Sequence, residues 1–331
     1  MASRVTLQDV ARHAGVSRTT ASFVLTGRRD MRISVDAEQR VLRAARELSY
    51  RPNLMARGLR TRTTHTIGLI SDTVTTEPFA GDIVRGAVNA ALRHDNLLVI
   101  GETSGDRGVE ERVVQDMLDR GVDGFLYAST WTRVSRLPAV LRGHPFVWLN
   151  CLPRGRASAS AVIPDERSAG TLAASALTAV GHERIALVGV PSPDVWAAGE
   201  RLAGIRAAGV TVAATVECDW WPEPAYTAVS SFLATGPSVT GLICLNDRIA
   251  LGAYQAAQEA GLRVPDDLSV VSFDDSDLAA WLRPSLTSVA LPHAELGGRA
   301  VDLLLSPPAS PLVERVPMRL HERASIAPPS S

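Results

Sequence analysis

The chain has 331 residues, of which 46% are hydrophobic and 21% are charged, and its formal net charge is −1 at pH 7. This length and apolar content are enough to bury two cores beyond a small third domain. No apolar run reaches membrane-spanning length, and the opening residues MASRVTLQDV lack the apolar core of a signal peptide, so we expect a cytoplasmic chain without membrane contact.

The residue types present exclude several kinds of chemistry. All 34 basic residues are arginine, which rules out a P-loop lysine, a Schiff-base lysine and a kinase-type lysine. The G-x-S-x-G and H-E-x-x-H patterns are absent as well. The cysteines Cys151, Cys218 and Cys244 have no metal-ligand spacing and are typical of buried thiols in a reducing compartment. We therefore expect no catalytic residue, no metal and no cofactor.

Charge is distributed unevenly along the chain. Residues 1–65 hold 13 arginines and five acidic residues, whereas the other 266 residues hold 21 arginines and 30 acidic residues. A basic head on an acidic body is expected when one end of a protein meets phosphate groups. Arginine-rich helices can also be merely solvated, so the interpretation of this charge as a phosphate-binding surface needs the support of a structural motif.

That motif is a pair of short helices near the N-terminus. Thr6 is an expected N-cap with Asp9 three residues on, and Gly15 ends the first helix. Ser17 is the expected N-cap of a second helix, which stops at Gly27. The apolar face of the first helix consists of Leu7, Val10, Ala11 and Ala14. Two short helices joined by a glycine-containing turn are typical of helix-turn-helix domains, whose second helix enters the DNA major groove.

A third helix is expected from Val35 to Ser49, capped by Ser34. Its expected apolar positions are Leu42, Ala45 and Leu48. Pro52 then stands where a further helix can begin, over residues 53–59. This hinge segment is short and contains Gly58, so an isolated helix there is marginal in water.

From Thr66 onward, short apolar strands alternate with helices. One series runs from TIGLIS to PFVWL and includes an expected helix at Val134–Leu141; the other runs from a helix at Ser168–Val180 to the strand LSVVSF. Strand–helix alternation at this spacing is typical of parallel doubly wound sheets. The expected fold class is therefore α/β, with two lobes that face a common crevice at the carboxyl ends of their strands.

Nine segments follow one another in a specific order: TLQDVARHAGVSRTTASFVL, YRPNLMARGLRT, HTIGLI, GVDGFL, GHERIALVG, ERLAGIRAAG, LNDRIALGAY, LRVPDDLSVVSFDD and RPSLTSV. In this order the chain resembles the lactose-repressor and purine-repressor (LacI/GalR) family of transcriptional regulators, from Val5 to about Leu320. The resemblance implies a three-helix DNA-binding head, a hinge, and a two-lobed effector domain like a periplasmic binding protein.

The expected domain boundaries combine the resemblance with the element pattern. Residues 1–50 are the helix-turn-helix domain, and residues 51–64 are the hinge helix and linker. Residues 65–323 bind the effector and dimerise. Lobe 1 takes about 65–163 and 294–321, lobe 2 takes about 164–293, and residues 324–331 are a flexible tail without leucine heptads.

In the head, Arg18 and Thr19 should face base edges, because arginine can bond guanine bidentately and threonine offers a hydroxyl or a methyl group. Phe23 stands where many relatives carry a polar base-reader; it either contacts a thymine methyl group or fills a gap between the head helices. The resemblance implies that the hinge is helical only on operator DNA, where Leu59 of each copy enters the minor groove; the alternative is an ordinary core leucine. The expected DNA-contacting set is Thr6, Ser17, Arg18, Thr19, Thr20, Ser22, Phe23, Asn53, Ala56, Arg57 and Leu59.

In the crevice, the resemblance singles out Arg201, Asn246 and Asp274, whose donors and acceptors suit a polyhydroxylated ligand. Either Trp220 or its neighbour Trp221 stacks on a sugar ring, or both belong to the core. Asp165 contacts the ligand or caps the next helix. The expected effector-binding set is Phe79, Asn150, Arg201, Trp220, Asn246, Asp274 and His293.

Two further patterns are weak. The segment GETSGDRG after the strand LLVIG faintly resembles a phosphate loop, but its glycines at 101, 105 and 108 do not have the G-x-G-x-x-G spacing, and we interpret it as a turn. The acidic residues Asp274, Asp275 and Asp277 have no nearby histidine in the sequence that would complete a metal site.

The leading hypothesis is a homodimeric transcriptional regulator, most simply a repressor, that binds a near-palindromic operator and responds to a small effector such as a sugar. A solute-binding protein and a sugar-acting enzyme on the same fold are the alternatives. The missing signal peptide and the basic head argue against the first alternative. The missing lysine and nucleophile patterns argue against the second.

Overall fold

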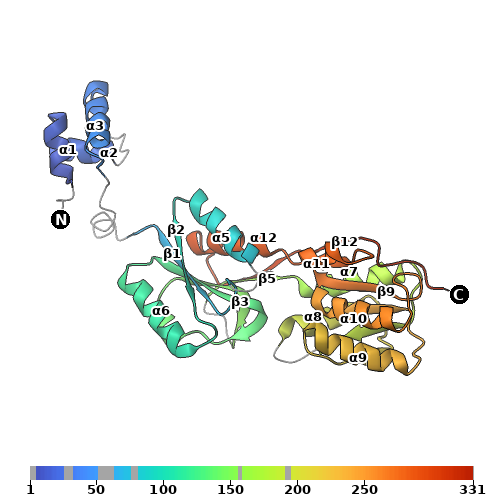
Figure 1. Ribbon diagram of the computed structural model, residues 1–331. Helices are drawn as coiled ribbons and strands as arrows, with labels where there is room; N and C mark the ends of the chain where they lie inside the picture. Colours follow the sequence, from blue (N-terminus) through green and yellow to red (C-terminus); the bar gives the residue numbers. More distant parts are fainter. Residues whose placement is uncertain are drawn as a thin grey trace. The chain divides into compact units, whose positions relative to one another are not determined.

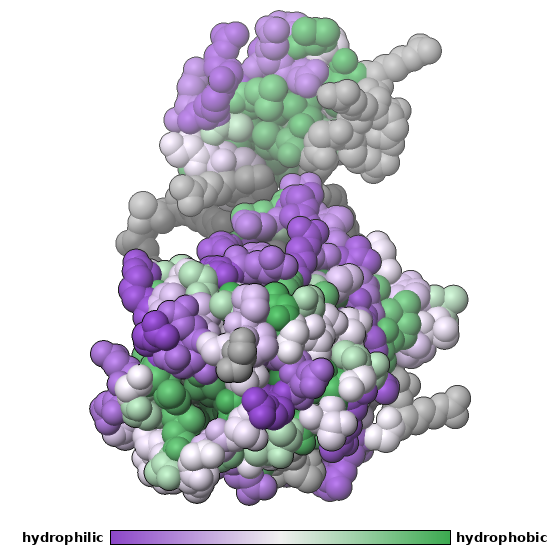
Figure 2. All heavy atoms as spheres, turned by 90° about the vertical axis from the view of Figure 1, so that its right-hand side faces the viewer, coloured by the Kyte–Doolittle hydropathy of each residue, from purple (hydrophilic) through white to green (hydrophobic). Residues whose placement is uncertain are grey.

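A computed structural model describes residues 5–25, 33–50, 63–75, 81–155, 159–190 and 195–330. The chain divides into two compact units, Met1–Thr64 and His65–Ser331, which Figure 1 shows. Within the described ranges, no helix is long and apolar enough to cross a membrane. On the face turned to the viewer in Figure 2, hydrophilic residues are interspersed with smaller apolar areas.

The N-terminal unit contains three helices: α1 (Leu7–Ala14), α2 (Arg18–Leu25) and α3 (Val35–Glu47). The capping box that the sequence predicts at α1 is confirmed: the Asp9 amide donates to Thr6 Oγ1 at 3.3 Å, and the Thr6 amide donates to Asp9 Oδ2 at 3.0 Å. Gly15 ends α1 in the left-handed conformation, with φ of 62°. The Ser17 hydroxyl accepts a hydrogen bond from the Thr20 amide at 3.0 Å and so caps α2.

The core of this unit shows one error in the sequence interpretation. Its buried residues are Val10, Ala11, Ala14, Ala21, Val41 and Ala44. Of the three apolar positions expected on α3, Ala45 and Leu48 are partly buried and pack against this core, but Leu42 is 41% exposed, and Val41 and Ala44 are the fully buried positions. Val41 and Ala44 are three apart, so they share one face of the helix, and Leu42 is turned about 100° away from Val41.

The second unit holds two six-stranded sheets. In lobe 1 the strand order is β11-β5-β4-β3-β1-β2, and in lobe 2 it is β12-β10-β9-β8-β6-β7. The lobe 1 strands are β1 (Thr66–Ser71), β2 (Leu97–Glu102), β3 (Gly124–Ser135), β4 (Phe146–Pro153), β5 (Ala161–Pro164) and β11 (Val313–Val316). The lobe 2 strands are β6 (Ile185–Val188), β7 (Ala214–Val216), β8 (Gly241–Cys244), β9 (Ser269–Asp274), β10 (Thr287–Ala290) and β12 (Arg319–His321). The strands pair in parallel, except that β12 is antiparallel to β10, so the predicted α/β fold class is confirmed.

Helices cover both faces of each sheet, as Figure 1 shows. Lobe 1 has α5 (Gly81–Arg93), α6 (Arg107–Asp119), a short 3-10 helix (Ala139–Leu141) and α12 (His293–Leu305). Lobe 2 has α7 (Glu166–Thr178), α8 (Trp196–Ala207), α9 (Pro222–Ala234), α10 (Asp247–Glu259) and α11 (Asp277–Trp281). In lobe 1, Leu69 and Leu126 lie in one apolar cluster with α5 and α12, while Ile70 and Phe125 lie in another with α6. This alternation follows from the two-residue period of a strand.

The predicted helix at Val134–Leu141 is wrong. Strand β3 continues to Ser135 and pairs with β4 a second time after a register shift, with Val134 opposite Leu152. Only the short 3-10 helix follows. Pro138 accounts for the rest of the difference, because it disfavours helical geometry at the residue before it.

The C-terminal segment also differs from the prediction. Lobe 1 ends with β11, and β12 lies in the sheet of lobe 2 instead of lobe 1. The segment 324–330 is no flexible tail: Ser325 is fully buried, it accepts from the Val270 amide at 2.8 Å, and its hydroxyl donates to Val270 O at 2.6 Å. This segment is therefore held by hydrogen bonds to Ser285 and to Val270 of β9, a strand inside the lobe 2 sheet.

Two helices of lobe 2 approach each other closely enough to exclude a side chain at their contact. A Cβ atom added to Gly170 on α7 would lie 2.0 Å from Arg201 O, and one added to Gly204 on α8 would lie 1.9 Å from Arg167 O. The contact holds α8 against the first turns of α7.

Gly204→Ala is expected to destabilise the effector unit by about 1–3 kcal/mol, because the backbone of α7 has to move to admit the new methyl group. The matched control is Gly199→Ala on the same helix, where nothing lies within 4 Å of an added Cβ atom. That variant should gain about 0.5–1 kcal/mol, since alanine is the better helix former. Urea unfolding followed by tryptophan fluorescence measures both; equal effects of the two variants would contradict the close contact.

Candidate functional site

The exposed end of α2 carries the residues predicted to read bases. Arg18 and Thr19 are exposed in its first turn. The Thr20 hydroxyl lies 2.8 Å from the Ser17 hydroxyl, so these two side chains complete the cap. Phe23 is partly exposed, whereas its neighbours Val24 and Leu25 pack against the core of the head. The predicted contacts Asn53, Ala56, Arg57 and Leu59 lie outside the described residues.

A cavity of about 240 Å³ lies between the two lobes, at the carboxyl ends of their strands. Its lining comes from both lobes: Thr130, Trp131, Thr132, Asn150, Glu166, Val195, Ala197, Arg201, Trp220, Trp221, Asn246, Arg248, Asp274 and Leu291. We call it the interlobe cavity. Beside it, Arg315 of β11 lies over the Trp196 ring of α8, 5.3 Å from the ring centroid.

The charge of Arg201 is balanced within lobe 2. The side chain is 2% exposed, and its Nε donates to Glu166 Oε2 at 2.7 Å. Its Nη1 donates to Leu245 O, and its guanidinium stacks on the Phe273 ring at 4.3 Å from the centroid. A buried ion pair of this kind brings no net charge to the cavity wall.

The two asparagines of the cavity are held by the protein. Asn150 Nδ2 donates to Ser129 O at 3.0 Å, and its Oδ1 accepts from the Thr132 hydroxyl at 2.7 Å. Asn246 is the N-cap of α10, and its Oδ1 accepts from the Ile249 amide at 2.7 Å. These amides therefore hold β3 and α10 in place around the cavity.

Asp274 differs from the two asparagines, because its side chain is not held by hydrogen bonds from the described residues. It ends β9 with φ of 104°, in the region that favours glycine, and such strained conformations cluster at functional sites. Burial, with the neighbouring Asp247 carboxylate, raises the pKa of Asp274 to about 8. Among the described residues, no side chain or amide donates a hydrogen bond to its carboxyl group, so this group is open to a ligand.

Three tryptophans line the same cavity. Trp131 and Trp221 are 45% and 52% exposed, while Trp220 is half-buried against the lobe 2 core. The Arg248 guanidinium stacks on Trp221 at 4.3 Å from the ring centroid. Both Trp220 and Trp221 therefore reach the cavity, and their faces can pack against the apolar face of a ring.

Comparison with known proteins identifies the family. Residues 6–53 match the bacterial regulatory proteins of the lacI family, and residues 174–326 match the periplasmic binding protein-like domain. The ribose operon repressor of Haemophilus influenzae is 33% identical, over 91% of this chain and 91% of that protein. The chain belongs to the lacI family of bacterial regulatory proteins. This confirms the resemblance, and with it the interpretation as a DNA-binding transcriptional regulator.

Other members of the lacI family extend the comparison. The ribose operon repressor of Escherichia coli is 32% identical, over 95% of this chain and 96% of that protein. The transcriptional repressor PurR of Vibrio cholerae is 31% identical, over 96% of this chain and 93% of that protein. The Lac repressor dimer bound to operator and an anti-inducer has a TM-score of 0.80 at 27% identity, covering 98% of this chain and 100% of that chain. A lacI-family regulator from Enterococcus faecium with bound ribose has a TM-score of 0.64 at 26% identity, covering 80% of this chain and 99% of that chain.

Within this lacI-family fold, five predicted effector-binding residues line the interlobe cavity: Asn150, Arg201, Trp220, Asn246 and Asp274. His293 does not. It is buried at the start of α12, and burial lowers its pKa to about 4. Leu291 lines the cavity instead, because it directly follows the last residue of β10. Phe79 lies outside the described residues.

The sequence interpretation missed Trp131, Glu166 and Arg248. Glu166 could have been found from its place after the strand AVIP, at the same sheet edge as the predicted residues. Asp165, for which two roles were open, caps α7 through a 3.3 Å bond from the Ser168 amide. Asp275 pairs with His321 and Arg323, and the described residues contain no cluster suited to a metal ion.

The raised pKa of Asp274 predicts a pH-dependent cost in stability. The folded protein retains a proton on this group that the unfolded chain releases near its ordinary pKa of 3.8. Asp274 should therefore contribute a loss of stability as pH rises from about 4 to about 8, and Asp274→Asn should lack this contribution.

The measurement is urea unfolding of both proteins at pH 5, 7 and 9. The advantage of Asp274→Asn should grow between pH 5 and 7 and change less above 8. The matched control is Asp277→Asn, an exposed acid at the start of α11 that lies outside the cavity. An advantage that stays constant with pH would show that Asp274 is ionised in the folded protein.

Proposed function

We propose that this protein is a transcriptional repressor whose affinity for operator DNA is controlled by a sugar bound in the interlobe cavity. The observation that carries the proposal is the open carboxyl group of Asp274 beside tryptophan faces, in a cavity between two lobes of a lacI-family chain. Hydroxyl groups of a sugar can donate to Asp274, and the apolar ring face can stack on Trp220 or Trp221.

The cavity chemistry favours an uncharged ligand. The charge of Arg201 is offset by Glu166, and the other ionisable residues of the lining are one acid, Asp274, and one arginine, Arg248, whose guanidinium lies over the Trp221 ring. The ribose operon repressors and the ribose-bound regulator are relatives whose names point to the same class of ligand. We therefore propose a neutral monosaccharide, held by Asn150, Arg201, Trp220, Asn246 and Asp274.

We also propose that the protein acts as a cytoplasmic homodimer without enzymatic activity. The Lac repressor that resembles it over nearly its whole length binds its operator as a dimer. A two-fold dimer presents two recognition helices, which requires a near-palindromic operator. Within this scheme, residues 1–50 read the operator and residues 51–64 connect them to the effector unit. Incubation with candidate sugars should leave each sugar unchanged.

Arg18→Ala should weaken binding to the specific operator by about 1–3 kcal/mol and leave non-specific binding nearly unchanged, because a base contact is lost and phosphate contacts remain. Operator and scrambled duplexes are titrated at one salt concentration. An equal loss on both duplexes would assign Arg18 to a phosphate group.

Asp274→Ala should abolish the response to sugar and preserve operator binding, because it removes an acceptor in the effector unit without altering the head. Operator titrations with and without saturating ribose measure this for the wild type, for Asp274→Ala and for the control Asp277→Ala. The wild type and the control should respond alike. A normal response of Asp274→Ala would exclude this residue from the sugar site.

A further inference from the structure

A larger cavity, of about 540 Å³, lies wholly within lobe 1. We call it the lobe 1 cavity. It opens at the carboxyl ends of β1 and β3, beside the first turn of α6 and the 3-10 helix. Nothing in the proposed function uses it, and none of its lining residues also lines the interlobe cavity.

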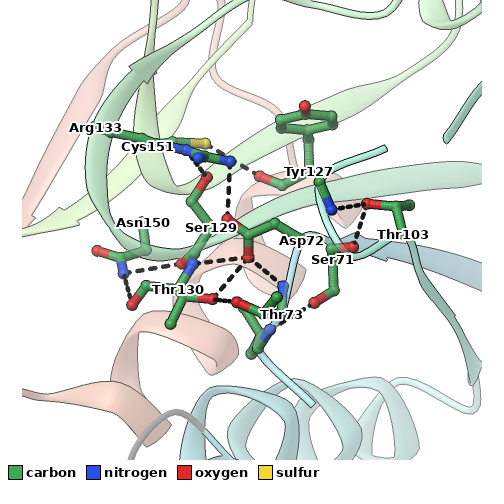
Figure 3. A network of polar contacts seen from close by, with 12 residues as sticks. Ser71, Asp72, Thr73, Thr103, Tyr127, Ser129, Thr130, Arg133, Asn150 and Cys151 are labelled. Carbon is green, nitrogen blue, oxygen red and sulfur yellow. Dashed lines mark hydrogen bonds and ion pairs between the residues drawn. The ribbon is translucent and has the colours of Figure 1, made fainter. Parts of the chain in front are cut away.

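A hydrogen-bonded network, which Figure 3 shows, connects residues that line the two cavities. Asp72 Oδ1 accepts from the Thr130 amide at 3.0 Å and from the Thr130 hydroxyl at 2.7 Å. Asp72 Oδ2 lies 2.8 Å from Arg133 Nη2, and Arg133 Nε donates to the Ser129 hydroxyl at 3.1 Å. Asp72 and Arg133 line the lobe 1 cavity, whereas Thr130 lines the interlobe cavity. The two cavities therefore have no lining residue in common, although their linings are bonded to each other.

The lining of the lobe 1 cavity has an excess of positive charge. Five arginines line it: Arg107, Arg133, Arg136, Arg142 and Arg154. Three acidic residues line it as well: Asp72, Glu110 and Glu111. Two of these acids already have partners, since Asp72 pairs with Arg133 and Glu110 accepts from the Tyr127 hydroxyl at 2.7 Å.

Three of the arginines keep their full bonding capacity. Across the described ranges, the guanidinium groups of Arg136, Arg142 and Arg154 have no hydrogen-bond or ion-pair partner. They come from three separate segments, since they directly follow β3, the 3-10 helix and β4, respectively. Convergence of unpaired guanidinium groups on one cavity is the arrangement that recognises phosphate and carboxylate groups through paired N–H donors.

The segment GETSGDRG borders this cavity with Thr103, Gly105 and Arg107. It is a turn, as the sequence interpretation held, and Asp106 caps α6. The Thr103 hydroxyl donates to Ser71 O at 2.9 Å, which fixes the turn against β1. Gly105 has φ of 74° and open space where a Cβ atom would lie, so a ligand can approach the backbone there.

We propose that the lobe 1 cavity is a second ligand site, which binds a small metabolite bearing phosphate or carboxylate groups through Arg136, Arg142 and Arg154. Its volume exceeds that of the interlobe cavity, so it has room for a sugar phosphate or a tricarboxylate.

The test is calorimetric titration of the full chain, without DNA and at constant ionic strength. The probes are glucose 6-phosphate, citrate and inorganic phosphate. At least one of the first two should bind, and Arg136→Gln/Arg154→Gln should weaken that binding at least tenfold. Tighter binding of glucose 6-phosphate would identify a phosphate ester as the ligand class, and tighter binding of citrate a polycarboxylate.

Two controls locate the site. Arg206→Gln/Arg319→Gln removes two exposed arginines of lobe 2 and changes the net charge equally, so it should bind the probe as the wild type does. Asp274→Ala should bind the probe normally even if it loses the response to sugar, which separates this proposal from the proposed function. Three results would overturn the proposal: no binding of either organic probe at millimolar concentration, an equal loss in both double variants, or a loss in Asp274→Ala.

Discussion

The interlobe cavity depends on the contact between α7 and α8. Gly170 and Gly204 let the backbones of these helices touch, and this brings Arg201 of α8 within reach of the Glu166 carboxylate, which lies one turn before Gly170 on α7. The ion pair forms between two almost fully buried side chains, and the guanidinium has two further contacts, a carbonyl oxygen and an aromatic face. A buried arginine without this carboxylate would be costly, whereas in the pair the charge of Arg201 is balanced. The close approach of these two helices therefore fixes the buried ion pair at the cavity wall.

The two lobes contribute unlike surfaces to the cavity. Lobe 1 presents Thr130, Trp131 and Thr132 from the extended part of β3, whose positions are set by Asn150 and Asp72. Lobe 2 presents the open carboxyl group of Asp274 and two tryptophans. A ligand that touches both surfaces favours one relative orientation of the lobes, and a preference of this kind can couple ligand binding to DNA binding.

Local patterns predicted the fold well and the details of the site less well. Caps such as Thr6 and Ser34 and the alternation of strands and helices are short-range features, and the structure has them. The extension of β3 to Ser135 depends on pairing with β4, and the burial of Ser325 depends on a strand more than fifty residues earlier, so neither has a local signal. The position of Leu291 in place of His293 required the last residue of β10 to be known. The convergence of Arg136, Arg142 and Arg154 comes from three segments that no sequence motif connects.

The route of the chain has a consequence for its synthesis. The core of the head uses residues up to Tyr50 only, so it can pack while the rest is still being translated. Lobe 1 is completed by α12 and β11, and lobe 2 by β12 and the segment around Ser325, all of which leave the ribosome last. Each lobe can therefore complete its fold only after strands far apart in the sequence have paired, as β5 does with β11. Such long-range pairing is slow to form. A ribosome that stops early would release a packed head attached to two unfinished lobes.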